Sequence, residues 1–211
     1  MNVDTDTYRV EELPVFLEDT KILMKEIQKL GFSDAQSLWK CNDKLAELNY
    51  FRFQEMDLER NLTPAVLTYE GLQYQHMAPE VFSEGALTYI QKNLRILSGF
   101  YGVLKPFDGV TPYRLEMQAK LSVQGKKDLY DHLILNLASK EYAKAVEKYL
   151  TPEDRFITVE FGERKDGKVK QKATLAKMAR GEMVRFMAEN NIQAPEEIKA
   201  FHELGFSFEG M

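Results

Sequence analysis

The chain has 211 residues, of which 44% are hydrophobic and 29% are charged, and its 28 Lys and Arg against 33 Asp and Glu give a formal net charge of −5. This composition excludes a fibrous or disordered chain, because enough apolar surface is present to offset the entropy of ordering the backbone. The longest apolar runs are far shorter than the roughly 20 residues of a membrane helix, so no membrane partner is expected. A negative total also argues against nucleic acid as a partner.

The start of the chain and its cysteine content indicate the compartment. Residues 1–6 are acidic, where a secretory signal would carry basic and then apolar residues. Cys41 is the lone cysteine, so no disulfide can form within the chain. We therefore expect a cytoplasmic protein in which Cys41 is a small buried hydrophobic residue. The alternative is an exposed, reactive thiol beside Lys40 and Lys44.

Three helices are predicted in the first quarter of the chain. The apolar residues of 13–30 recur at helical spacing and predict a helix. Ser33 begins a capping-box pattern, which predicts a short helix over 33–40. Asn42 is expected to cap a third helix over 43–53, and the last two helices should form a tight pair.

The middle of the chain is less regular. Residues 63–69 are rich in β-branched residues and predict a strand. Ser83 is expected to cap a helix that begins at Glu84. Residues 94–104 mix apolar residues with glycines, and the pattern does not decide between helix and strand.

A hairpin and a basic helix are predicted near the end of the chain. Residues 156–163 and 168–174 alternate in polarity around the turn dipeptide Asp166-Gly167. A basic helix over 175–190 follows. Helices and strands are mixed without a βαβ rhythm, so we expect an α+β fold and one mixed domain over 1–211.

The charges are strongly segregated along the sequence. Residues 92–127 hold seven bases and two acids, and residues 164–185 hold eight bases and two acids. These 58 residues carry +11 and the other 153 carry −16. If the two basic stretches converge in the fold, they form a groove that attracts phosphates, because salt screens the opposing acids beyond about 8 Å. For the hairpin lysines taken alone, a solvated face is the favoured interpretation.

Several segments of the sequence match long and specific motifs of a known protein family. Residues 94–108 (LRILSGFYGVLKPFD) and 112–117 (PYRLEM) resemble the signature of the YaaA family of bacterial peroxide-stress proteins. Further matching segments are 42–46 (NDKLA) with Asn49 and Arg52, 69–71 (YEG) with Tyr74, 136–142 (NLASKEY), and 176–181 (AKMARG), so that the resemblance extends over nearly the whole chain.

The resemblance implies a cytoplasmic protein that is made under hydrogen peroxide stress and limits iron-driven oxidative damage to DNA and proteins. It further implies a DNA-binding α+β fold with a helix-hairpin-helix-like element. The family usually begins with an apolar strand leading into Ser-Pro-Ala-Lys and carries an additional segment where 131–134 lie in this chain. This sequence starts after the first piece. The second piece is either deleted from the chain or omitted from the printed sequence, and we favour omission because both flanks match the family closely.

Candidate phosphate contacts follow from the residues themselves. The start of the third predicted helix, with Lys44, has the size of a phosphate site, although Asp43 would repel a phosphate and can act as a plain cap. Arg95 and Arg114 suit bidentate phosphate contact, and the neighbouring Tyr101 and Tyr113 could stack on a splayed base. The alternative for Arg114 is a buried ion pair with Glu116 or Asp108.

Lys177 and Arg180 share one helical face, and the adjacent Gly181 permits a close approach of backbone or ligand. The predicted DNA-contacting residues are Lys44, Arg52, Arg95, Arg114, Lys177, Arg180 and Arg185. His76, His132 and His202 stand far apart without metal-ligand spacing, so no metal site and no cofactor are expected. No catalytic residue is predicted.

The sequence therefore predicts a monomer that binds the backbone of double-stranded DNA without strong sequence preference. The alternative is an enzyme, glycosylase-like or acting on a nucleotide-like molecule, that uses Lys177 or the pair Arg114 and Glu116 in a pocket. A third hypothesis is that the protein acts through a protein partner.

Overall fold

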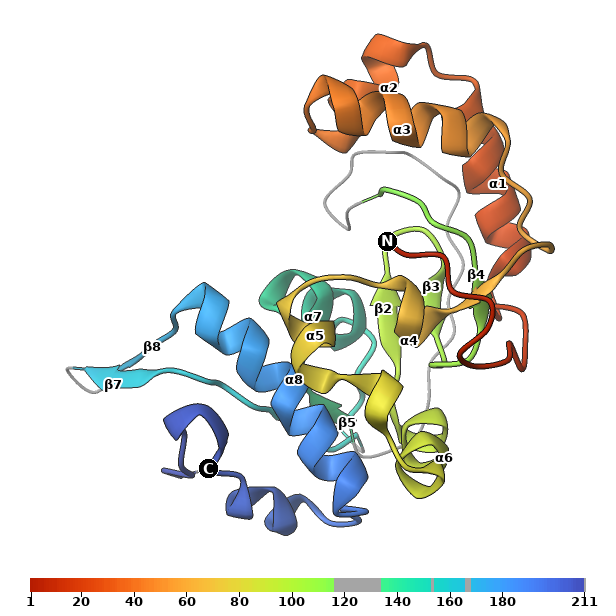
Figure 1. The fold of residues 1–211 in the computed structure, drawn as a ribbon. Coiled ribbons are helices and arrows are strands. Elements are labelled where there is room, and N and C mark those ends of the chain that lie inside the picture. The colour runs from red at the N-terminus through yellow and green to blue at the C-terminus, as the bar shows by residue number, and fades with distance from the viewer. Residues whose placement is uncertain (116–133, 153, 166–167, 211) are drawn as a thin grey trace. The chain divides into compact units, whose positions relative to one another are not determined.

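The computed structural model describes residues 1–115, 134–152, 154–165 and 168–210 (Figure 1). The chain divides into two compact units, one formed by Met1–Tyr69 with Arg95–Asp128 and the other by Glu70–Leu94 with Leu129–Met211. Several predictions fall outside the described residues, namely those on Glu116, on the part of the basic stretch 92–127 that follows residue 115, on residues 131–133 and on the turn Asp166-Gly167.

The first unit combines helices with two short antiparallel strand pairs. Its elements are α1 Leu17–Gln28, α2 Phe32–Trp39, α3 Asp43–Gln54, β1 Thr63–Pro64, α4 Ala65–Thr68, β2 Ile96–Ser98, β3 Gly102–Leu104 and β4 Gly109–Val110. Strand β1 pairs with β4, and β2 pairs with β3.

The helix pair α2–α3 is confirmed and contributes to the core of this unit. Trp39 stacks on Phe53 at 5.5 Å between ring centroids, and Phe53 meets Phe100 edge-on at 5.4 Å. The Asn42 side chain accepts a hydrogen bond from Leu45 N at 3.0 Å, which confirms it as the cap of α3. The predicted Ser33 cap is wrong, because α2 begins at Phe32 and Ser33 lies inside its first turn.

Two element boundaries differ from the prediction. Helix α1 begins at Leu17, later than expected, because Pro14 disfavours helical geometry at Leu13, whose side chain is exposed. The predicted strand over 63–69 shrinks to β1 because its partner β4 has only two residues. The chain then makes the single helical turn α4.

Residues 94–104, left undecided by the sequence, form a β-hairpin. Ile96 pairs with Leu104 and Ser98 with Gly102, whose φ of 75° is in the left-handed region that glycine adopts readily. The Ser98 Oγ accepts hydrogen bonds from the backbone N–H of Phe100 and of Tyr101 at 3.1 and 2.8 Å, which fixes the turn.

The second unit is built on one long helix. Its elements are α5 Leu72–Met77, η1 Pro79–Val81, α6 Glu84–Asn93, β5 Ile134–Asn136, α7 Lys140–Glu147, β6 Phe156–Thr158, β7 Glu163–Lys165, β8 Lys168–Lys170, α8 Ala173–Glu189, η2 Pro195–Ala200 and η3 Glu203–Gly205. Strands β5 and β6 pair in parallel and β7 and β8 antiparallel. Ser83 caps α6 through Ala86 N, as predicted.

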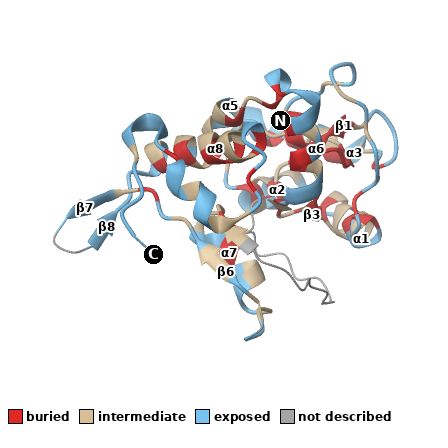
Figure 2. Cartoon of the chain, turned by 90° about the horizontal axis from the view of Figure 1, so that it is seen from below, coloured by how far each residue is buried: buried red, intermediate tan, exposed pale blue. Residues whose placement is uncertain are grey.

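Helix α8 supplies much of the core of this unit, as the buried positions in Figure 2 show. One apolar cluster is formed by buried side chains of α8 and of the segments around it, namely Phe161, Ala176, Ala179, Met183 and Phe201. On another side α8 crosses α5 so closely that a Cβ added at Gly181 would lie 2.1 Å from Gln73 O.

The α+β class is confirmed, and so are the hairpin and the basic helix near the end of the chain. The hairpin is shorter than predicted, because residues 156–158 leave it to pair in parallel with β5. The organisation as one domain stays a prediction, as does the role of α2–α3 as a DNA-binding helix-hairpin-helix.

Candidate nucleic-acid interface

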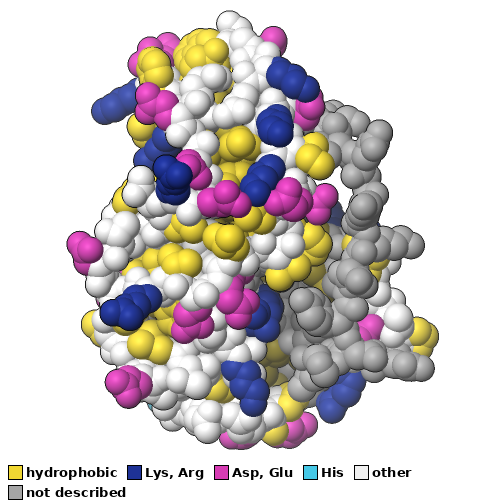
Figure 3. All heavy atoms as spheres, turned by 90° about the vertical axis from the view of Figure 1, so that its right-hand side faces the viewer, with side chains coloured by type: hydrophobic (Ala, Val, Ile, Leu, Met, Phe, Trp, Pro, Cys, Tyr) yellow, Lys and Arg dark blue, Asp and Glu magenta, His cyan; other side chains and the backbone are white. Residues whose placement is uncertain are grey.

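The predicted DNA-contacting side chains fall in both units. Lys44, Arg52, Arg95 and Arg114 belong to the first unit, and Lys177, Arg180 and Arg185 belong to the second. The structure defines the surroundings of each set within its own unit. On the face drawn in Figure 3, the Lys and Arg side chains of the described residues lie interspersed with Asp and Glu.

The start of α3 is satisfied without a ligand. The Asp43 carboxylate accepts a hydrogen bond from Gln36 Nε2 at 2.7 Å, and Asn42 caps the helix. A carboxylate in the first turn already complements the helix dipole. Lys44 is exposed beside it and Arg52 is half-buried in the last turn, so these two side chains, rather than the helix N-terminus, remain the candidate contacts.

Arg114 has a structural contact. Its Nε donates a hydrogen bond to Trp39 O at 3.3 Å, at the C-terminal end of α2. A guanidinium at that position satisfies a terminal carbonyl and complements the negative end of the helix dipole. The alternative ion pair with Asp108 is wrong, because the Asp108 carboxylate accepts from Lys105 N at 2.9 Å instead.

Asp108, which the sequence singled out only as an alternative partner of Arg114, is a buried carboxylate. The residue is 1% exposed, and its Oδ1 has no hydrogen-bond partner among the described residues. Burial raises its pKa above the usual value, while the bond from Lys105 N and the charges of Lys105 and Arg95 act in the opposite direction. Lys105 Nζ binds Glu12 at 2.7 Å. Arg95 therefore lies within the electrostatic reach of a local charge cluster.

The prediction that Tyr101 and Tyr113 stack on a splayed base is wrong. Tyr101 is 0% exposed and Tyr113 is 7% exposed, so neither ring has a free face. The Tyr113 hydroxyl lies 2.6 Å from Ser98 Oγ and 3.0 Å from the Tyr69 hydroxyl. Both rings pack against Phe100, so their role is to build the core.

Arg180 is the most unusual predicted contact. It is half-buried, its Nε is enclosed, and its guanidinium has no hydrogen-bond or ion-pair partner among the described residues. Burial lowers its pKa, yet an arginine stays protonated in proteins. Enclosed charged groups normally have partners, and an unsatisfied one calls for an explanation such as a bound ion. Lys177, one turn earlier on α8, is exposed.

Arg185 and Gly181, the other residues of α8 that the sequence singled out, both have neighbours in the structure. Arg185 Nε already binds Glu189 Oε1 at 2.9 Å, one turn further along the helix, which makes it a weaker candidate. Gly181 allows the close approach predicted for it, and the neighbour is the backbone of α5 at Gln73.

The crossing of α5 and α8 also creates a pair that spacing along the chain did not reveal. His76 Nδ1 lies 2.8 Å from Glu182 Oε1, and both side chains are half-buried. The two residues are 106 positions apart, so no local sequence signal could have found them. A carboxylate that orients an imidazole is a common arrangement for general acid–base chemistry.

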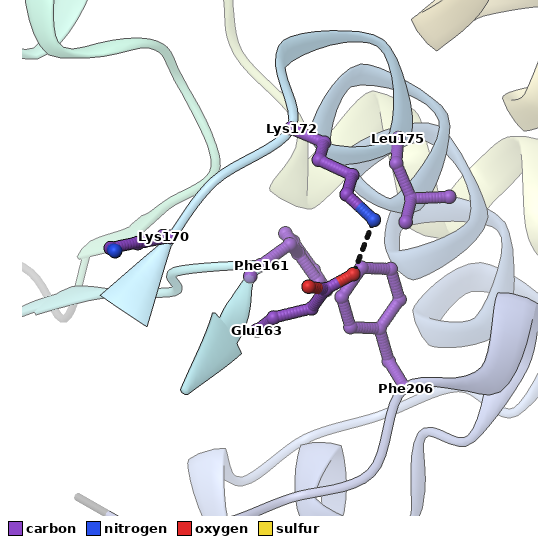
Figure 4. A pocket seen from close by; sticks show the side chains of 7 residues that line it. Phe161, Glu163, Lys170, Lys172, Leu175 and Phe206 are labelled. Carbon is purple, nitrogen blue, oxygen red and sulfur yellow. Dashed lines mark hydrogen bonds and ion pairs between the residues drawn. The ribbon is translucent and has the colours of Figure 1, made fainter. Parts of the chain in front are cut away.

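A shallow hollow lies at the base of the β7–β8 hairpin (Figure 4). Phe161, Leu175 and Phe206 form its apolar part, and an ion pair between Lys172 and Glu163 lies beside them. None of the seven predicted contact residues lines this hollow.

Among the residues that the structure describes, no group of three or more His, Cys, Asp or Glu side chains could hold a metal ion. No helix in the same residues is long and apolar enough to cross a bilayer.

Together, these features define an α+β protein with cationic side chains in both units, one of which, Arg180, is half-buried and has no partner among the described residues. The family model described as peroxide stress protein YaaA matches residues 1–211. A UPF0246 protein of Agathobacter rectalis is 52% identical over 222 residues, covering 99% of this chain and 89% of that protein. UPF0246 proteins of Pediococcus pentosaceus and Desulfitobacterium hafniense are 51% and 50% identical, each covering 99% of this chain and 88% of their own length. The chain belongs to the YaaA family of peroxide stress proteins.

Proposed function

We propose that this protein binds the backbone of double-stranded DNA in the cytoplasm during the response to hydrogen peroxide, without strong sequence preference, and so limits iron-driven oxidative damage. Membership of the peroxide stress family supports the physiological setting. The observation that carries the DNA-binding part is Arg180, a half-buried guanidinium without a partner among the described residues.

A charged group that is partly enclosed by protein is unfavourable unless it has a partner. Leaving a charged donor unsatisfied is unfavourable by about 1–3 kcal/mol or more, and a phosphate oxygen removes that penalty with a charge-assisted hydrogen bond. Lys177 lies on the same face of α8, three residues before Arg180, and adds a second exposed cation. Lys44, Arg52, Arg95, Arg114 and Arg185 are proposed as further contacts, within their own units.

The test is fluorescence anisotropy with a labelled duplex at several salt concentrations. Each phosphate contact contributes about −0.9 to the slope of log affinity against log salt, so Arg180→Gln and Lys177→Gln should each reduce the slope by roughly that amount. The loss should be the same for duplexes of unrelated sequence. Lys25→Gln, which removes an exposed charge from α1, is the matched control and should leave the slope unchanged.

Absence of binding by the unmodified protein even at low salt would end the proposal. The physiological part is tested in cells lacking the protein, which should accumulate more oxidised DNA under peroxide, with rescue by an iron chelator. Complementation by Arg180→Gln should be weaker than by the unmodified protein.

One observation favours a second function, an enzyme acting on nucleic acid. The His76–Glu182 pair lies beside Gly181 and close along α8 to Arg180. Lys177 is exposed, whereas a nucleophilic lysine must be desolvated, so the dyad replaces it as the candidate catalytic group. Cleavage of a duplex carrying an oxidised base, lost in both His76→Ala and Glu182→Gln but kept in Lys25→Gln, would support the enzyme. No cleavage by the unmodified protein would exclude it for that substrate.

A further inference from the structure

The hairpin of β7 and β8 forms a ribbon that extends away from α8 (Figures 1 and 2). All six of its strand residues are exposed. The register pairs Glu163 with Lys170, Arg164 with Val169, and Lys165 with Lys168. A two-stranded ribbon with both faces in water is only marginally stable by itself. Its side chains do not pack into a core, so they are available for binding.

One face of the ribbon carries an excess of positive charge. Directly opposite residues share a face, and so do residues two apart, which places Lys165, Lys168 and Lys170 together with Glu163. Lys165 stands directly opposite Lys168, and like charges in that position destabilise a strand pair. Glu163 is engaged by Lys165 at 3.3 Å and by Lys172, whereas Lys168 has no ion-pair partner in the described part of the chain.

The base of the ribbon is held against the rest of the unit. A Cβ added at Gly162 would lie 2.6 Å from Val169 Cγ1 and 2.8 Å from Lys170 O, so the two strands approach closely there. Phe161, one residue earlier, is buried in the apolar cluster of α8. In Figure 4, Lys172 and Glu163 face each other over this base while Lys170 is directed away from them. The ribbon is thus anchored at one end, which lowers the entropy lost when it binds.

The dimensions of the ribbon fit one kind of partner. Paired strands lie about 4.8 Å apart, so a two-stranded ribbon with its side chains fills a groove about 12 Å wide. The major groove of B-form DNA has that width and admits such ribbons, whereas the major groove of an RNA duplex is deep and narrow. The exposed ion pairs of the ribbon are each worth at most about 1 kcal/mol, so phosphates can displace them.

We propose that the β7–β8 ribbon enters the major groove of B-form DNA and that Lys165, Lys168 and Lys170 contact phosphates along its walls. This inference rests on the proposed function and names the element and the groove. The competing explanation is that the lysines only prevent exposed strand edges from pairing with other chains.

The experiment compares the unmodified protein with the double variants Lys168→Gln/Lys170→Gln and Lys168→Glu/Lys170→Glu. The matched control, Lys148→Gln/Lys199→Gln, removes two exposed lysines of the same unit that do not belong to β7 or β8. Affinity is measured on a B-form duplex, on the same duplex with glucosylated hydroxymethylcytosines that fill the major groove, and on an RNA duplex of the same sequence.

The neutral ribbon variant should lose roughly 30-fold in affinity for B-form DNA at 0.15 M salt, since two contacts with a slope of about 0.9 each are removed. The glucosylated duplex should bind the unmodified protein more weakly and show no difference between it and the ribbon variant. The RNA duplex should be insensitive to the ribbon variant, and the control should match the unmodified protein on all three. Unchanged urea midpoints show that these surface changes leave the fold intact.

The outcomes separate the two proposals. If the unmodified protein binds no DNA, the proposed function fails and this inference with it. If it binds and the neutral ribbon variant binds equally well, the ribbon inference alone fails. Equal loss on the RNA duplex would also overturn it, because the ribbon would then contact phosphates without entering a groove. If the Lys168→Glu/Lys170→Glu variant binds DNA as well as the unmodified protein, the lysines serve only to prevent the exposed strand edges from pairing with other chains.

Discussion

Replacing Gly181 by alanine tests the close crossing of α5 and α8. The new Cβ would lie 2.1 Å from Gln73 O and 2.9 Å from Met77 N, and both are backbone atoms that cannot rotate away. Because Cβ contacts below 3.0 Å essentially never occur, the two helices must separate by about an ångström. Overpacking of this kind costs about 1–3 kcal/mol and sometimes more, against a gain of about 1 kcal/mol in helix propensity.

The expected net loss is about 2 kcal/mol in the free energy of unfolding, because two backbone segments must move. For a chain of this size that corresponds to a Tm lower by about 4–8 °C. The measurement is thermal and urea unfolding followed by circular dichroism. The same separation should weaken the 2.8 Å contact between His76 and Glu182.

Gly85→Ala is the matched control for that experiment. Gly85 also lies in a helix, α6, but the nearest atom to its added Cβ is Ser83 Oγ at 3.9 Å. This variant should be as stable as the unmodified protein or more stable by up to about 1 kcal/mol. If Gly181→Ala unfolds at the same midpoint as Gly85→Ala, the close crossing does not exist as described.

Two further predictions concern the first unit. Asn42→Ala should lower the free energy of unfolding by about 1 kcal/mol because it removes the cap of α3. Ser33→Ala, inside the first turn of α2, should leave the free energy of unfolding unchanged. Urea titration of both variants measures the two values, and equal losses would contradict the assignment of Asn42 as the cap. Burial raises the pKa of Asp108, so this carboxyl ionises at lower pH in the unfolded chain than in the folded one. The stability of the unmodified protein relative to Asp108→Asn should therefore fall as pH rises from about 3 through the pKa of Asp108 in the folded state. Urea unfolding of both proteins over this range measures the difference, and a difference that is constant or rises with pH would contradict the burial of the carboxylate.

Local signals in the sequence were accurate where neighbours along the chain decide the structure. The caps Asn42 and Ser83 were predicted correctly because a capping side chain bonds to a backbone N–H three residues later. The strand predicted over 63–69 was too long, because the length of a strand depends on a partner distant in sequence. The positions of Tyr101 and Tyr113 were misjudged for the same reason, since their burial depends on how the hairpin 94–104 packs.

The sequence by itself determined the α+β class, most of the helices, the final hairpin and the family, because these follow from periodicity, turn residues and motif identity along the chain. Only the tertiary structure decided which charged groups have partners. It paired Arg185 with Glu189, brought His76 to Glu182, buried Asp108, and left Arg180 enclosed without a partner among the described residues. Burial and pairing depend on distances between segments remote in sequence, and one-dimensional spacing carries no information about those distances.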